Sequence, residues 1–267
     1  MKIFIQIIGI GLLFYCVIGV ALFFLQEKML FFPMGAPFGA CPQMDRYNAK
    51  AIDSNGIRYY LKEASNPDSW IIVFHGNAGN ACDRTYFWDL LSGMNSNLVI
   101  FEYPGYGDDG NAPGQKLILK QAQELVSQIK KTRSGSLPIY LMGESLGTGV
   151  ATWVSTQTRI SGLILISAYT SIANVAQKHY PWLPVKYLLK HKFLAHIWAQ
   201  ESISPAIFFH GIDDDIIPIT FAREQVLNFK GKAQLVEIEK CGHNDIVDVG
   251  KDIMQNNIKM FILKTLP

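Results

Sequence analysis

One stretch of this sequence, residues 137–151, is compatible with few folds. It begins with the apolar segment Leu-Pro-Ile-Tyr-Leu-Met, continues with Gly-Glu-Ser-Leu-Gly and ends in Thr-Gly-Val-Ala. That order predicts a buried strand, a sharp turn and a closely packed helix, since glycines beside the turn avoid collisions that larger side chains would make. Such a turn holds Ser145 in a strained conformation with its hydroxyl exposed above the sheet, which is a nucleophile elbow. The five-residue pattern also occurs by chance, so its context must support this interpretation.

Short apolar blocks recur after residue 70, and they alternate with segments of helical spacing. Blocks of this kind predict strands buried on both faces. We therefore expect an α/β fold with a mostly parallel central sheet and helices on both faces. An Asn-Gly turn at 55–56 predicts a β-hairpin over residues 49–61. The other expected strands cover residues 70–74, 98–103, 137–142, 163–166, 206–209 and 235–239, and the expected helices end near 91 or cover 114–131, 146–158 and 245–263.

The N-terminal residues 3–25 contain no charged side chain. About 23 residues at 1.5 Å each give a helix of roughly 34 Å, which can cross the hydrocarbon core of a bilayer. We expect residues 1–26 to form an uncleaved single-pass anchor, with a cleaved signal peptide as the alternative. Lys2 precedes the span, whereas Glu27 and Lys28 cancel after it, so the positive-inside rule places the rest of the chain outside the cytoplasm.

Residues 27–48 form the expected connector between this segment and the domain. Apolar and aromatic side chains at 29–33 are typical of a membrane surface, and the alternative is a strand edge or plug packed on the domain. Cys41 and Cys82 could pair outside the cytoplasm, but free buried thiols are the preferred interpretation. The net charge of +2 argues against a nucleic-acid partner, and no cysteine–histidine cluster predicts a metal site.

The remaining residues, 49–267, suit one globular domain. Its strand–helix alternation is interrupted at about 171–204, where Tyr-Pro-Trp-Leu-Pro precedes an aromatic and basic stretch. We expect a short helical insert in this region. It would either cover the site as a cap or form a surface helix pair with only a packing role.

Candidate reactive residues fall at the carboxyl ends of the predicted strands, where active sites of open α/β sheets form. The hydroxyl of Ser145 needs an adjacent base. His243 follows the last predicted strand and could reach Ser145 across that edge. The acid is expected between these two in the sequence, where Asp213, Asp214 and Asp215 follow the fifth strand.

An oxyanion in such a site needs two backbone N–H donors. One is expected from Leu146, directly after the serine, and the other from the glycine-rich loop after residue 74, most simply from Asn77. His75 and His210 each precede a glycine at a strand end, and we expect both to serve backbone hydrogen bonding.

Taken together, these motifs resemble the α/β-hydrolase superfamily, and most of all its membrane-anchored serine hydrolases of the ABHD type. In that family's His-Gly-x-x-Asp-x-x-Ile/Val-Pro pattern the acid is the fifth residue, which selects Asp214. The residue after His-Gly supplies the oxyanion donor, which selects Asn77. Family members often place serine where this chain has Asp108 and Asp109. The motifs span nearly the whole chain and comprise the apolar N-terminus with residues 26–33, His-Gly-Asn-Ala-Gly-Asn at 75–80, Tyr-Pro-Gly-Tyr-Gly at 103–107, the elbow, residues 210–218 and Gly-His-Asn-Asp at 242–245.

The resemblance implies a serine hydrolase that cleaves carboxylic esters or thioesters through an acyl-enzyme. Ser145 would attack, His243 would transfer the proton and Asp214 would orient His243. No metal or organic cofactor is expected, and residues 3–25 would tether the enzyme near acylated or lipid-like substrates. The alternatives are a serine peptidase on the same scaffold, which would usually need an additional gating domain, and a tethered binding protein that kept the fold without the chemistry.

Overall fold

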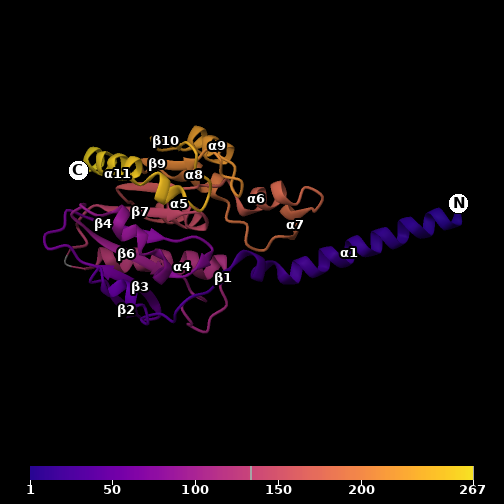
Figure 1. Ribbon diagram of the computed structural model, residues 1–267, viewed down its shortest axis with the longest axis horizontal. Coiled ribbons are helices and arrows are strands. Elements are labelled where there is room, and N and C mark those ends of the chain that lie inside the picture. The colour runs from indigo at the N-terminus through magenta and orange to yellow at the C-terminus, as the bar shows by residue number, and fades with distance from the viewer. Residues whose placement is uncertain (133, 267) are drawn as a thin grey trace.

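The computed structural model describes residues 1–132 and 134–266. Arg133 and Pro267 belong to the predicted domain 49–267 and lie outside the described residues. A long helix, α1 (Lys2–Leu30), extends away from a rounded body that holds the other elements (Figure 1). The helix α1 is long and apolar enough to cross a membrane, and its most apolar stretch is not buried against the domain. The helix runs beyond the expected boundary at residue 26 and ends at Leu30.

The body is built on an eight-stranded sheet with the order β10-β9-β8-β7-β4-β6-β3-β2. Neighbours from β10 to β6 are parallel, and the hairpin of β2 and β3 continues the sheet with antiparallel pairs. The mostly parallel sheet and the hairpin over 49–61 are therefore confirmed. The strands are β2 (Lys50–Ser54), β3 (Ile57–Lys62), β4 (Ser69–Phe74), β6 (Ser96–Glu102), β7 (Ile139–Glu144), β8 (Gly162–Ile166), β9 (Ala206–Gly211) and β10 (Ala233–Ile238).

Helices cover both faces of this sheet, as expected (Figure 1). Alternate side chains of β4 explain why, since Ile72 and Phe74 belong to one hydrophobic cluster and Ile71 and Val73 to a second. The first cluster is covered by α4 (Gln115–Lys130), α5 (Leu146–Gln157), α8 (Ala195–Glu201) and α9 (Thr220–Asn228). The second is covered by α3 (Tyr86–Leu90), α10 (Ile246–Val249) and α11 (Lys251–Thr265).

Two expected helices are each divided in the structure. The helix expected to end near residue 91 consists of a 3₁₀ turn, η1 (Ala81–Arg84), followed by α3, and a capping box between Asn80 and Asp83 starts the turn. The closing helix expected over 245–263 is interrupted at Gly250, between α10 and α11. A side chain at Gly250 would approach Ile238 to 2.5 Å, so the backbone passes against β10 at this point.

The connector after α1 is packed on the domain rather than extended along a surface. Its strand β1 (Phe32–Pro33) pairs in parallel with β5 (Ala78–Gly79), and Phe31 is buried in the core. This matches the strand-edge alternative. A short helix, α2 (Pro42–Asp45), follows.

The preference for free thiols at Cys41 and Cys82 was wrong, because the two residues form a disulfide with Cα atoms 5.8 Å apart. Cys41 precedes α2 and Cys82 lies in η1, and both elements pack on the same hydrophobic cluster. The sequence separation of 41 residues gave no indication that these loops lie together.

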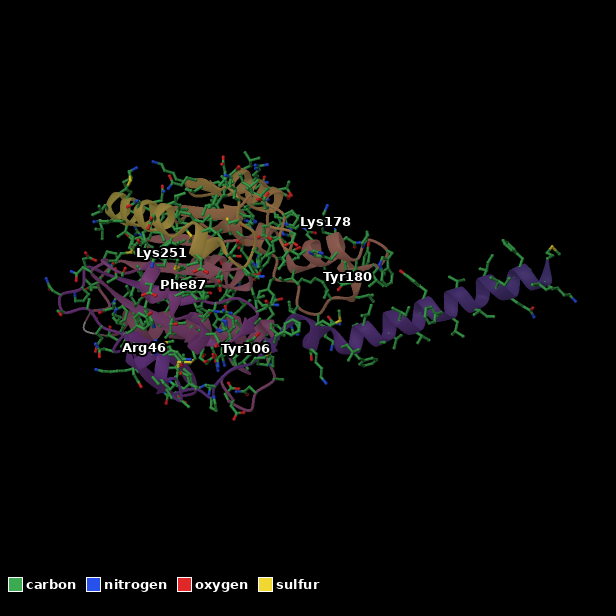
Figure 2. The ribbon with its side chains drawn as sticks, viewed as in Figure 1. Arg46, Phe87, Tyr106, Lys178, Tyr180 and Lys251 are labelled. Atoms are coloured by element: carbon green, nitrogen blue, oxygen red, sulfur yellow. A yellow bond between two sulfur atoms is a disulfide. The ribbon has the colours of Figure 1, made fainter. Side chains whose placement is uncertain are left out.

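The expected insert contains α6 (Ile172–His179) and α7 (Val185–Leu188), which project from the body toward α1 (Figure 1). The third helix of the segment, α8, instead packs on α5 within the body. Lys178 and Tyr180 lie on the projecting part, and the side chains of α1 stand clear of the domain along most of the helix (Figure 2).

Candidate active site

Ser145 occupies a strained turn between β7 and α5. Its φ of 48° and ψ of −117° lie outside the regions that most residues adopt. A side chain at Gly147 would come within 1.9 Å of the Phe74 carbonyl oxygen, and one at Gly143 within 2.5 Å of the Gly147 carbonyl oxygen. The motif therefore requires glycine on both sides of the serine, as the sequence indicated.

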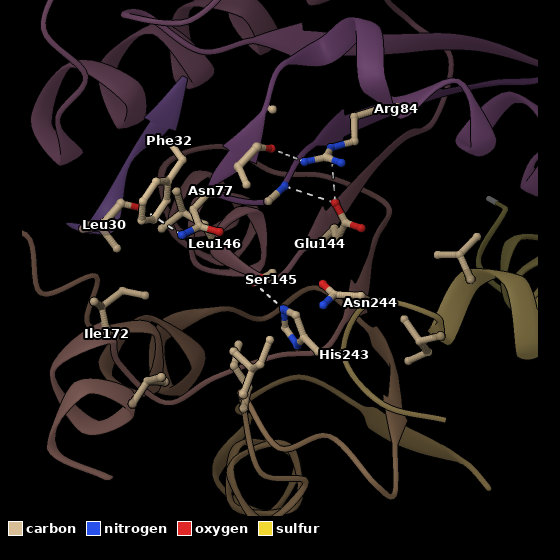
Figure 3. Close-up of a pocket in the computed structure, with 18 of the residues that line it drawn as sticks. Leu30, Phe32, Asn77, Arg84, Glu144, Ser145, Leu146, Ile172, His243 and Asn244 are labelled. Atoms are coloured by element: carbon tan, nitrogen blue, oxygen red, sulfur yellow. Dashed lines mark hydrogen bonds and ion pairs between the residues drawn. The ribbon is translucent and has the colours of Figure 1, made fainter. Parts of the chain in front are cut away.

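The structure brings three sequence-predicted residues together at the carboxyl edge of the sheet. The His243 Nε2 atom lies 3.0 Å from the Ser145 Oγ atom, and its Nδ1 atom lies 2.8 Å from the Asp214 Oδ2 atom. Figure 3 marks the contact between Ser145 and His243. Ser145 follows β7, Asp214 follows β9 and His243 follows β10, so three separate strand ends supply the set. Asp213 and Asp215 are exposed, which leaves Asp214 as the residue that faces the imidazole.

The Asp214 carboxylate is buried and fully engaged. Its Oδ1 atom accepts hydrogen bonds from the backbone N–H groups of Ile216 at 3.0 Å and Ile217 at 2.7 Å, and its Oδ2 atom also lies 3.3 Å from the His210 Nε2 atom. Burial alone would raise the pKa of Asp214, but hydrogen bonds from His210 and His243 outweigh it and hold this pKa well below its usual range. The carboxylate is thus kept ionised beside His243.

The two expected oxyanion donors, Asn77 and Leu146, line the same pocket as Ser145 and lie next to each other in Figure 3. Leu146 is the first residue of α5, so its N–H has no partner within the helix. The Asn77 side chain is turned away, because its Nδ2 atom donates to the Leu30 carbonyl at 2.9 Å (Figure 3). The Asn77 carbonyl in turn accepts from the Phe32 N–H at 3.0 Å and the Tyr106 hydroxyl at 2.6 Å. These bonds fix the loop from the α1 side and leave the Asn77 N–H as the group available to the site.

Sequence reasoning missed the residues that support this loop from the other side. The Glu144 Oε2 atom accepts from the Gly76 N–H at 3.1 Å, and its Oε1 atom accepts from the Tyr86 hydroxyl at 2.6 Å. Arg84 pairs with Glu144 at 3.6 Å and donates to the Ala78 carbonyl (Figure 3). Burial and the adjacent Glu144 charge raise the pKa of Tyr86 well above its usual value. Glu144 occupies a variable position of the serine motif, and nothing in the sequence linked it to residues near 84.

His75 and His210 have the structural roles expected of them. The His75 Nδ1 atom lies 2.7 Å from the Gly76 carbonyl oxygen, and the His210 Nε2 atom lies 2.7 Å from the Ile217 carbonyl oxygen. Burial, reinforced by the charge of Arg84, lowers the pKa of His75 well below its usual value. His75 is therefore a neutral structural residue, whereas His210 also contacts Asp214.

A cavity of about 700 Å³ opens above Ser145 and His243. Its walls come from the loop 76–79, α1, α6 and α10, and they include Leu30, Phe32, Tyr86, Ile172, Val175, Ala176, Tyr180, Ile246, Val247 and Asp248. Most of these side chains are apolar, so the cavity suits a substrate with a hydrophobic part. Within residues 1–132 and 134–266, no group of three His, Cys, Asp or Glu side chains could hold a metal ion.

Comparison with known proteins identifies the family. Residues 65–203, just over half of the chain, match the Hydrolase_4 family, described as serine aminopeptidase, S33. The chain belongs to this α/β-hydrolase family. The sequence-based resemblance to the superfamily is therefore confirmed.

Relatives and solved structures agree with that assignment. An uncharacterized protein of Mycobacterium tuberculosis is 28% identical over 253 residues, which cover 90% of this chain and 88% of that protein. The lysophosphatidylserine lipase ABHD12 of Danio rerio is 30% identical over 66% of this chain and 51% of its own length. The ferulic-acid-bound structure of Est1E from Butyrivibrio proteoclasticus has a TM-score of 0.67 and 19% identity, and covers 81% of this chain and 99% of that one. At that identity the likeness to Est1E shows the fold.

Proposed function

We propose that this protein is a membrane-anchored serine hydrolase that cleaves carboxylic esters or thioesters. The observation that supports it most is the hydrogen-bonded series Ser145–His243–Asp214 beneath a largely apolar cavity. The lipase name of the Danio rerio relative favours ester substrates. Anchoring by α1 favours acylated or lipid-like ones.

The proposed reaction proceeds through an acyl-enzyme. His243 Nε2 accepts the proton of Ser145 Oγ as this oxygen attacks the acyl carbonyl carbon. The N–H groups of Asn77 and Leu146 stabilise the oxyanion of the tetrahedral intermediate. His243 then gives the proton to the departing alcohol or thiol, and later activates the water that releases the acid. Asp214 remains ionised and stabilises the imidazolium in both steps.

A peptidase is the second candidate, and the family description as serine aminopeptidase is the observation that favours it. An aminopeptidase must bind the positively charged amine of its substrate. The Glu144 carboxylate beside Ser145 is already engaged by the Gly76 N–H, Tyr86 and Arg84, so it offers little to an incoming amine. We favour ester substrates because the lining of the cavity is largely apolar and because the Danio rerio relative is named a lipase. A binding protein without chemistry is disfavoured because all three reactive positions are filled and connected.

We further propose that the domain lies outside the cytoplasm. Lys2 precedes the uncharged residues 3–25, whereas Glu27 and Lys28 cancel after them, which agrees with the positive-inside rule. The disulfide between Cys41 and Cys82 is a second, independent argument, because disulfides persist mainly in oxidising compartments.

Labelling with a fluorophosphonate probe tests the proposed nucleophile. We expect the full-length chain in detergent to be labelled, and Ser145→Ala and His243→Ala to lose the label. Ser127→Ala, which changes an exposed serine of α4, is the matched control and should label as wild type does. Assays with p-nitrophenyl butyrate and leucine p-nitroanilide then separate esterase from aminopeptidase. A folded wild type that fails to label, or a Ser145→Ala variant that still labels, contradicts the proposal.

A further inference from the structure

A second cavity of about 160 Å³ lies between α1 and the insert, and we call it the anchor groove. Its residues are Leu22, Phe23, Gln26, Met29 and Leu30 of α1, with Ile172, Ala176, Tyr180, Leu183, Val185, Leu188 and Leu189 of the insert. Four of them, Leu30, Ile172, Ala176 and Tyr180, also line the cavity above Ser145. The anchor groove is therefore continuous with the wall of the candidate active site.

The anchor groove suits an apolar occupant. Gln26 and Tyr180 are the polar side chains in its lining, and the amide of Gln26 is already engaged. The Gln26 Nε2 atom donates to the carbonyls of Phe23 at 2.7 Å and Leu188 at 3.3 Å, and its Oε1 atom accepts from the Lys190 N–H at 2.7 Å. These bonds satisfy the one buried amide and leave aliphatic and aromatic surface toward the groove.

Polar contacts hold the two walls of the anchor groove together. Glu27 lies 3.3 Å from the Lys190 ammonium and 3.5 Å from the His191 ring, and the Tyr15 hydroxyl donates to the Trp182 carbonyl at 2.8 Å. These pairs join segments more than 160 residues apart in the sequence. The membrane helix and the insert thus form one binding surface between them.

We propose that the anchor groove binds the acyl chain of an ester lipid that enters from the bilayer, with the ester carbonyl at Ser145. This inference rests on the proposed function and specifies its substrate class. The groove has a volume of about 160 Å³, which is less than one turn of a protein helix about 10 Å across would fill, so it suits a single flexible chain. Leu22 and Phe23 belong to the predicted span, so the outer end of the groove meets the hydrocarbon of the membrane. Each methylene buried there should improve binding about fourfold.

The first test compares Leu22→Trp, which fills the anchor groove, with Leu25→Trp. Leu25 is exposed near Leu22 on α1 and lines none of the cavities described above, so it is the matched control. We expect Leu22→Trp to lower the ratio of kcat/KM for p-nitrophenyl dodecanoate to that for p-nitrophenyl butyrate at least tenfold. Leu25→Trp should leave the ratio within twofold of wild type. An unchanged ratio in Leu22→Trp would overturn only the proposal that the anchor groove binds the acyl chain. A wild type that hydrolyses neither ester would contradict the proposed function.

The second test needs no substitution and so does not depend on folding of a variant. A long-chain fluorophosphonate with a diazirine at its chain end would label Ser145 in the wild-type, full-length chain. On irradiation we expect cross-links within residues 22–30 or 172–189. Cross-links within residues 244–248, on the other side of the cavity, would overturn the proposal.

The third test addresses entry from the bilayer. The full-length enzyme is reconstituted in phosphatidylcholine vesicles that carry p-nitrophenyl palmitate. We expect Leu22→Trp to slow hydrolysis at least tenfold, while Leu25→Trp hydrolyses the ester at the wild-type rate. Equal rates in the two variants would show that bilayer substrates bypass the groove.

Discussion

The two sides of the Ser145 cavity are built differently. On the reactive side, Ser145, Asp214 and His243 follow the carboxyl ends of three parallel strands of one sheet, and hydrogen bonds fix each one. On the opposite side, the anchor groove joins two helical segments through a few polar contacts around apolar surface. From this difference we infer that the sheet positions the proposed reactive residues, whereas we propose that the surfaces shared by α1 and the insert select the substrate.

The largest effect should come from the reactive side and be independent of the acyl chain. Asp214→Asn keeps the shape of the side chain but removes the acceptor that orients His243, so kcat should fall about 10⁴-fold. The loss should be equal for p-nitrophenyl butyrate and dodecanoate. Asp213→Asn, at the exposed neighbour, is the control and should stay within twofold of wild type. A loss of kcat that depends on acyl-chain length would show that Asp214 also affects binding of the acyl chain, and would contradict the distinction between the two sides.

The disulfide ties the connector after α1 to η1, which ends at the supporting residue Arg84 and precedes Tyr86. Replacing Cys41 and Cys82 together by alanine should lower the free energy of unfolding by about 3 kcal/mol, because the unfolded chain gains freedom over a long loop. Urea denaturation measures this change, with Cys16→Ala on the exposed face of α1 as control. If the double variant and the control unfold with equal free energy, the disulfide does not stabilise the folded chain.

Glu102, at the end of β6, should make stability depend on pH. Burial raises the pKa of Glu102 to about 8, against partial compensation by the Ala81 N–H and the Arg58 charge. The folded state therefore binds a proton that the unfolded state releases above about pH 4.5. The resulting stabilisation is present at low pH and declines as the pH rises toward 8, by up to about 1.4 kcal/mol per pH unit.

The variant Glu102→Gln should remove this decline of the free energy of unfolding with rising pH. The free energy of unfolding is measured by urea denaturation at several values between pH 5 and 8. Glu63→Gln, at an exposed glutamate, is the control and should keep the wild-type slope. If Glu102→Gln and wild type decline in parallel, the protonation of Glu102 does not contribute.

The smallest effect concerns the support of the loop 76–79, which contains the proposed oxyanion donor Asn77. Glu144→Ala removes the acceptor of the Gly76 N–H and should displace the neighbouring Asn77, which lowers kcat about tenfold with KM changed less than twofold. Glu144→Gln retains an acceptor oxygen and should recover most of the rate. A rise in KM alone would instead assign Glu144 to substrate binding.

The reactive side could be predicted from sequence because its residues sit in local motifs. Gly143 and Gly147 mark the elbow. The loops that contain Asp214 and His243 each follow a strand that is recognisable from its run of apolar residues. The supports could not be predicted, since the contact of Glu144 with Tyr86 joins segments 58 residues apart without a recurring pattern. The same holds for the Cys41–Cys82 bridge and for the contacts of Gln26 with Leu188 and Lys190 of the insert. These contacts arise from packing between segments that are far apart in the sequence, so no local sequence pattern indicates them.

The central claim is that Ser145 carries the acyl group during turnover. It is tested most directly by quenching the full-length enzyme in acid during hydrolysis of p-nitrophenyl butyrate and measuring peptide masses. The account predicts a butyryl group on the peptide that contains Ser145 in wild type, and none in Ser145→Ala, which also stops releasing p-nitrophenol. Undiminished release by Ser145→Ala, or a butyryl group on another residue, would contradict it.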